Sequence, residues 1–189
     1  MKQENVLFGK IKRVNIVRDK DSVKRNLNLY ILCKNSNNNL VRANMSIKQN
    51  LKNWINKYRM INDSINIKNA YIVNVQINFE IVVNPNYNNS EVITNCITSL
   101  QNYFKIDKWQ INEPIIIKNI NLLLSKVEGV QIVKKVIINN LTGESLGYSN
   151  FSYDVIAANI DDVIYPSIDP MIFEVKYPDQ DIIGKVVPI

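Results

Sequence analysis

Residues 71–83, YIVNVQINFEIVV, alternate between apolar and polar side chains over most of their thirteen positions. Successive side chains of a β-strand point to opposite faces of its sheet. One face would carry the apolar side chains Tyr71, Val73, Val75, Ile77, Phe79, Ile81 and Val83, and the other would carry Asn74, Gln76, Asn78 and Glu80. This pattern predicts a long, half-buried antiparallel strand.

Toward the C-terminus, the segment 84–87 breaks the strand, and Ser90 with Glu91 is a favourable start for a helix. Its predicted buried face is Ile93, Cys96, Ile97, Leu100 and Phe104. A third helix is predicted around residues 119–127, with Ile120, Leu123, Leu124 and Val127 inward. Gly129 suits a left-handed residue after that helix, and a strand is expected over residues 130–138.

Toward the N-terminus, residues 8–17 and 27–32 are predicted to form two strands of a hairpin. A helix is expected from Ile47 to Tyr58, with Ser46 as its N-cap. Its apolar stripe is Ile47, Leu51, Trp54, Ile55 and Tyr58. The opposite face carries Lys48, Lys52 and Lys57, which favours a solvated face over a helix that binds nucleic acid or a membrane surface.

After residue 139 the sequence becomes rich in turns and prolines, with one short strand expected over residues 171–177. We therefore predict an α+β fold: a mixed or antiparallel sheet, about three helices and an extended C-terminal arm. The predicted core domain covers residues 1–139, and the arm covers residues 140–189.

The composition argues against common catalytic chemistry. The chain has no histidine, so it lacks the usual general base and metal ligand, and its 5 glycines form no phosphate-binding motif. Asp161 and Asp162 form an adjacent acid pair, but neighbours in an extended segment point apart and do not share a metal or a proton. Cys33 and Cys96 fit buried, reduced thiols better than reactive ones. We expect no catalytic, cofactor or metal site, no small-molecule substrate and no enzymatic activity; a hydrolase acting without histidine is a distant alternative.

Charge is distributed unevenly along the chain. Residues 1–59 hold 14 Lys/Arg against 3 Asp/Glu, whereas residues 60–189 hold 9 against 14. This pattern is typical of two situations: a basic half that binds nucleic acid, or contacts between the basic and acidic parts of different copies. We favour the contact between copies.

The sequence also bears on location. No apolar run approaches the length of a membrane span, and the N-terminus lacks the pattern of a secretion signal. We therefore expect a protein made in the cytoplasm and not inserted in a membrane.

Several strings of residues, in order along most of the chain, resemble one known family. They lie at residues 17–20, 25–28, 58–67, 70–75, 103–115, 127–130, 163–166 and 173–182. Among them are KIDKWQINEPI after Phe104 and FEVKYPDQDI from Phe173. These strings are similar to the C-terminal region of the baseplate wedge subunit of T-even-type contractile-tailed bacteriophages, a member of the J-like baseplate family.

The resemblance implies a structural role in the virion tail baseplate, made in a host bacterium. In that family two copies of the subunit pair with a larger wedge protein, and the wedges join into a ring around the tail hub. The family protein is several times longer, and the N-terminal part that forms a helical bundle with the larger partner has no counterpart here. The resemblance therefore implies the self-pairing, ring-forming contact, with copies of itself and other baseplate wedge proteins as partners.

We expect aromatic side chains of the arm and basic side chains of the first strands to contribute to such contacts. The aromatic candidates are Tyr148, Phe151, Tyr153, Tyr165, Phe173 and Tyr177, and the basic candidates are Arg18, Lys20 and Arg25. For Phe173 and Tyr177, folding back onto the same domain is an equal alternative.

Overall fold

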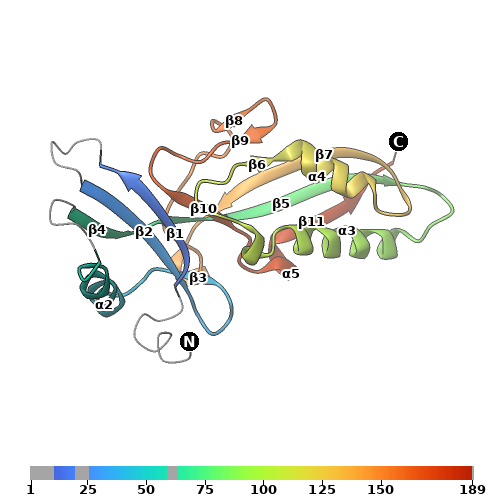
Figure 1. Cartoon of the computed structure of the whole chain (residues 1–189). Coiled ribbons are helices and arrows are strands. Elements are labelled where there is room, and N and C mark those ends of the chain that lie inside the picture. The colour runs from blue at the N-terminus through green and yellow to red at the C-terminus, as the bar shows by residue number, and fades with distance from the viewer. Residues whose placement is uncertain (1–10, 20–25, 59–63, 189) are drawn as a thin grey trace. The chain divides into compact units, whose positions relative to one another are not determined.

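A computed structural model describes residues 11–19, 26–58 and 64–188 (Figure 1). It confirms the predicted α+β class: among these residues there are four α-helices, three of them at least seven residues long, with antiparallel and mixed sheets. The chain divides into two compact units. Unit 1 comprises residues 1–71 and 168–171, and unit 2 comprises residues 72–167 and 172–189. The predicted domain boundary at residue 139 falls inside unit 2.

Unit 1 is built on a mixed sheet with one helix against it. β1 (Ile11–Arg18) pairs antiparallel with β2 (Asn26–Lys34), as the predicted hairpin requires. On its other side β2 pairs with β3 (Leu40–Val41) and, in parallel, with β4 (Ser64–Asn69), a strand that the alternation pattern did not predict.

Helix α2 (Met45–Ile55) covers one face of this sheet. Its side chains Ile47, Leu51 and Ile55 pack against a small core of Leu29, Ile31, Cys33 and Ala43. Two predictions about this helix were wrong. Its N-cap is Asn44, whose side chain accepts a hydrogen bond from the Ile47 amide at 2.8 Å, and not Ser46.

The second wrong prediction concerns the buried stripe of α2. Trp54 and Tyr58, which we expected to be buried, are 44% and 73% exposed. The helix ends at Ile55, and Trp54 lies about 60° around the helix from Leu51, because each residue turns the helix by about 100°. The two rings contact each other, with centroids 4.9 Å apart.

Unit 2 is a mixed sheet with two helices on one face. Its centre is β5 (Tyr71–Val83), which has the predicted bounds. β7 (Val130–Leu141) pairs with one edge of β5 in the antiparallel direction. β10 (Met171–Glu174) also pairs with β5, and β11 (Ile182–Val186) pairs with it in parallel.

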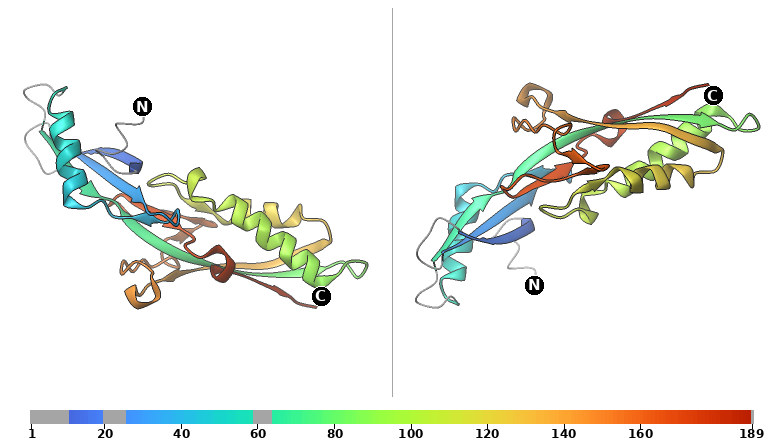
Figure 2. Two further views of the ribbon diagram at one scale, coloured as in Figure 1. Left: turned by 90° about the horizontal axis from the view of Figure 1, so that it is seen from below. Right: turned by 90° about the horizontal axis from the view of Figure 1, so that it is seen from above.

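Helices α3 (Asn89–Tyr103) and α4 (Ile117–Ser125) lie on the same face of this sheet (Figure 2). The fully buried side chains of α3 are Val92, Cys96 and Leu100, and Phe104 is buried directly after it. Ile93 and Ile97, which we expected to be inward, are only half-buried, because the helix turns Val92 toward the sheet instead. α4 buries Ile117, Ile120 and Leu124. Gly129 has the predicted positive φ, of 90°, four residues beyond the end of α4.

The segment predicted as an extended arm contains several further elements. β8 (Asn159–Ile160) and β9 (Val163–Ile164) form a small sheet with β6 (Ile115–Ile116), and α5 (Pro178–Asp181) leads into β11. Two short 3-10 turns, Ile106–Lys108 and Glu144–Leu146, complete the chain. Residues 171–175 and Ile182 are buried, so this part of the chain packs within the protein itself.

Candidate assembly interface

Tyr148 and Tyr177, two of the aromatic interface candidates, contact each other within unit 2. Their rings meet edge to face with centroids 5.5 Å apart. The Tyr148 hydroxyl donates a hydrogen bond of 2.6 Å to Asp181, which is 1% exposed, and the Tyr177 amide donates to the other carboxylate oxygen at 2.8 Å. Burial, together with the hydrogen bond to Asp181, raises the pKa of Tyr148. Both rings are half-buried and hold α5 in place.

Phe173 and Tyr153 form a second aromatic pair. Phe173 is 1% exposed, so in the described part of the chain it has no surface to offer a partner. Tyr153 lies edge to face against it, with centroids 6.0 Å apart, and donates a hydrogen bond to the carbonyl of Tyr165. Burial raises the pKa of Tyr153. Tyr165 is 49% exposed, and Phe151 is half-buried.

A buried asparagine explains why these rings turn inward. Asn74, which the alternation places on the solvent side of β5, is 1% exposed. Its amide nitrogen donates to Glu174 at 3.0 Å, and its amide oxygen accepts from the Ser149 backbone at 2.7 Å. Asn140 donates to the Asn74 carbonyl and accepts from the Tyr153 amide. The segment around residues 148–153 is therefore fixed to β5, β7 and β10 by satisfied buried hydrogen bonds.

Of the three basic candidates, only Arg18 lies in the described chain. It is exposed at the end of β1, where it pairs across from Leu27. Lys20 and Arg25 lie outside the described residues. The described structure therefore gives no geometry for the basic cluster as a whole.

The structure places three other lysines together, in a groove of about 380 Å³ between α2 and β4. They are Lys48 and Lys52 of α2 and Lys68 of β4. The sequence shows the spacing of Lys48 and Lys52 by one helical turn, but the pairing of β4 with β2 is what adds Lys68. We refer to this site as the lysine groove.

The two units carry opposite net charge. Unit 1 holds 15 Lys/Arg and 5 Asp/Glu, whereas unit 2 holds 8 Lys/Arg and 12 Asp/Glu. In the described part of unit 1, residues 11–19, 26–58, 64–71 and 168–171, the only acidic side chains are Asp19 and Asp169. The charge asymmetry of the sequence is therefore a difference between folded units.

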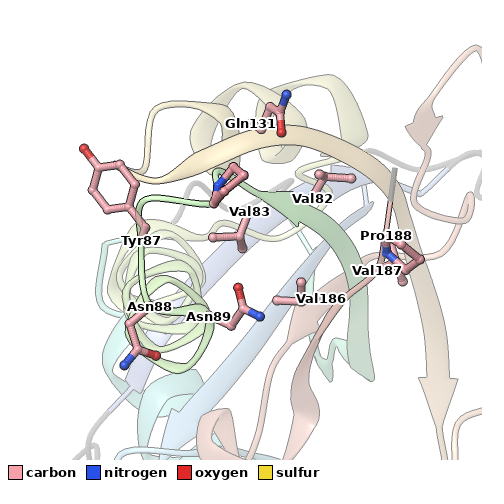
Figure 3. Close-up of a pocket in the computed structure, with 10 residues that line it drawn as sticks. Val82, Val83, Tyr87, Asn88, Asn89, Gln131, Val186, Val187 and Pro188 are labelled. Carbon is pink, nitrogen blue, oxygen red and sulfur yellow. The ribbon is translucent and has the colours of Figure 1, made fainter.

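A groove within unit 2 has a volume of about 730 Å³ and lies between the end of β5, the start of α3 and the C-terminal strand (Figure 3). Val83, Asn89 and Val186 lie near its centre in this view, and Tyr87 lies at its margin. Among the described residues that line it, Tyr87 is the only ionisable one. A hydrogen bond to Glu128 raises the pKa of that hydroxyl. Apolar and amide side chains make up the rest of the lining, and these can bind a chain but supply no acid, base or nucleophile.

The described residues lack two further kinds of site. They contain no group of three or more side chains positioned to hold a metal ion. They also contain no helix with the length and apolar character needed to span a membrane.

Asp161 and Asp162 do not lie in an extended segment as we expected. Their φ angles are 53° and 65°, and the two residues form the turn between β8 and β9.

Comparison with known proteins gives no assignment. No protein-family model matches the chain. No curated protein matches it significantly either.

Proposed function

We propose that this chain is a structural component of a contractile phage tail, a baseplate wedge module that pairs with copies of itself and helps form the ring around the tail hub. The observation that carries the proposal is the opposite net charge of the two units, +10 for unit 1 and −4 for unit 2. Oppositely charged surfaces on one chain favour contacts between copies and fix their register. The resemblance to the wedge subunit supplies the kind of assembly.

The contact between copies is expected to join different surfaces, a basic one and an acidic one. A contact of this kind is heterologous, and repeated heterologous contacts close into a ring when the rotation between copies allows it. A structural role of this type needs no cofactor and no catalytic side chain. Other wedge proteins are further partners under this proposal.

Binding of nucleic acid is the second candidate function, because unit 1 is strongly basic and presents the lysine groove. Against it, the lining residues that the structure describes include no aromatic side chain on which a base would stack.

Light scattering of the purified chain over a range of protein and salt concentrations tests the proposal. We expect a molar mass that rises above 21.8 kDa with protein concentration and falls as salt is added, because salt screens exposed charges. A duplex DNA fragment is titrated in parallel. A monomer at every concentration that binds DNA with a steep salt dependence would contradict the assembly role and support the second candidate.

A further inference from the structure

The lysine groove of unit 1 has the chemistry of a binding site for an acidic protein segment. Lys48 and Lys52 line it from α2 and Lys68 from β4, and the described residues that line it include no acidic side chain. The Lys68 ammonium lies 5.9 Å from the centre of the Tyr30 ring, on the face of the sheet opposite the one that Leu29, Ile31 and α2 share, so the charge in the groove comes from Lys48 and Lys52. These two lysines lie one helical turn apart, and together they attract carboxylates more strongly than an isolated surface lysine does.

The groove also has an apolar part. Met45 and Ile67 belong to its lining, and Met45 is 78% exposed. An exposed methionine next to lysines suits a partner that combines carboxylates with an aliphatic side chain. The phosphate backbone of a nucleic acid carries charge but no aliphatic side chain, so it would make no apolar contact with Met45 and Ile67.

Unit 2 presents a segment with this combination, the hairpin of β8 and β9. Asp161 and Asp162 form its two-residue turn, and both are exposed. Ile160, directly before the turn, is 58% exposed. The hairpin tip therefore carries two carboxylates beside an exposed aliphatic side chain, which matches the lysines and Met45 of the groove.

The hairpin is held rigidly, so little conformational entropy would be lost when it binds. Ile164 is 1% exposed and pairs with Ile115 of β6. The carbonyl of Asp162 accepts a hydrogen bond of 2.8 Å from the amide of Ile117, the first residue of α4. A two-residue turn with positive φ at both positions is also a narrow and well-defined protrusion.

We propose that the tip of the β8–β9 hairpin of one copy binds in the lysine groove of a second copy. This inference rests on the proposed function, because it names the surfaces through which the copies pair. The contact is heterologous, so each copy offers one groove and one hairpin and can bind two neighbours. That arrangement permits a ring.

Charge reversal on each surface tests the proposal in the full chain. The groove variant is Lys48→Glu with Lys52→Glu, and the hairpin variant is Asp161→Lys with Asp162→Lys. Sedimentation velocity measures self-association of each variant alone and of an equal mixture. Glutamate forms helices well, and its unfavourable interaction with the helix dipole at position 52, in the last turn of α2, costs only about 0.3–1 kcal/mol, so the groove variant is expected to fold.

Each variant alone places like charges in contact, and we expect its self-association to be at least about fivefold weaker than that of the unmodified chain. In the mixture, the new lysines at the hairpin of one variant can contact the new glutamates in the groove of the other. The unchanged hairpin of the groove variant can likewise contact the unchanged groove of the hairpin variant. The mixture is therefore expected to recover association. This recovery cannot come from a variant that fails to fold.

Two controls separate charge at the contact from other effects. The variant Lys105→Glu with Lys126→Glu changes two exposed lysines of unit 2 outside the hairpin and lowers the net charge by the same amount as the groove variant, and it should leave association unchanged. The variant Asp161→Asn with Asp162→Asn keeps residues that tolerate positive φ, so it removes the charge without straining the turn. It should weaken association.

The outcomes distinguish this inference from the proposed function. If the unmodified chain self-associates but the groove variant does so equally well, or the mixture recovers nothing, the assigned surfaces are wrong and self-pairing stands. If the unmodified chain is a monomer at all concentrations, both are wrong. If the groove variant loses only its binding to a DNA duplex, the groove serves nucleic acid and this inference is overturned.

Discussion

Gly184 lies opposite Phe79 in the parallel pairing of β11 with β5. A Cβ atom added to Gly184 would lie 2.8 Å from Cε2 of Phe79 and closer still to Cζ, well inside van der Waals contact. Phe79 is 1% exposed, so its ring has little room to move. We expect Gly184→Ala to lower the free energy of unfolding by about 1–3 kcal/mol, measured by chemical denaturation.

A matched control for this substitution lies next to it. Lys185 is exposed and points to the other face of the strand, so Lys185→Ala should change the free energy of unfolding by less than about 0.5 kcal/mol. In a Phe79→Leu background, Gly184→Ala should cost less free energy of unfolding than it does in the unmodified chain, because the smaller side chain leaves room for the added methyl group. Equal stability of Gly184→Ala and the unmodified chain would show that the close approach of the ring is not required.

The buried thiol of Cys96 makes the free energy of unfolding depend on pH. Burial raises the pKa of its thiol from 9.0 to about 11. Between these two pH values the unfolded chain loses the thiol proton while the folded chain keeps it, so the free energy of unfolding falls as pH rises through this window. The loss should reach up to about 2 kcal/mol near pH 11.

Denaturation curves from pH 8 to 11 check this expectation. Cys96→Ala removes the titrating group and should give a shallower decrease than the unmodified chain, whatever its absolute stability. Tyr148 and Cys33, whose pKa values are also raised, titrate in both proteins and cancel in the comparison. Parallel curves for the two proteins would mean that the Cys96 thiol ionises as easily when folded as when unfolded.

At the scale of elements, α2 and α3 differ in how firmly they are held. α2 has no buried residue, whereas α3 buries Val92, Cys96 and Leu100. A helix that makes few buried apolar contacts opens at a lower free energy. We expect backbone amides of α2 to exchange at least about tenfold faster than those of α3, measured by hydrogen exchange with mass spectrometry. Equal protection would mean that the two helices open together.

At the scale of the whole molecule, residues 140–189 are required for the fold of unit 2. They supply β10 and β11, which cover one edge of β5, and the buried side chain of Phe173. Removing them would expose that edge and leave the face between β5 and α3 incomplete. We expect a chain ending at residue 139 to lose its near-UV circular dichroism and its cooperative thermal transition.

The full-length variant Tyr165→Ala is a suitable control for the truncation, because that side chain is 49% exposed. It should retain both signals. A truncated chain that still unfolds cooperatively, at a temperature close to that of the full chain, would show that residues 140–189 form a separable arm as the sequence suggested.

Patterns between near neighbours in the chain determined much of this fold. The alternation of residues 71–83 predicted the bounds of β5, and the spacing of Ile47, Leu51 and Ile55 predicted the packed stripe of α2. The excess of lysine and arginine before residue 60 anticipated the basic unit. These signals are readable because side chains two or four residues apart share a face in a strand or a helix.

Contacts between distant segments decided the rest. Only the tertiary structure shows that β11 pairs in parallel with β5, that Asn74 is buried by hydrogen bonds to Glu174 and Ser149, and that Lys68 joins Lys48 and Lys52. Phe173 is buried for the same reason, whereas Tyr165 stays 49% exposed. No local period encodes such pairings, because their free energy comes from burying groups that lie about a hundred residues apart in the sequence.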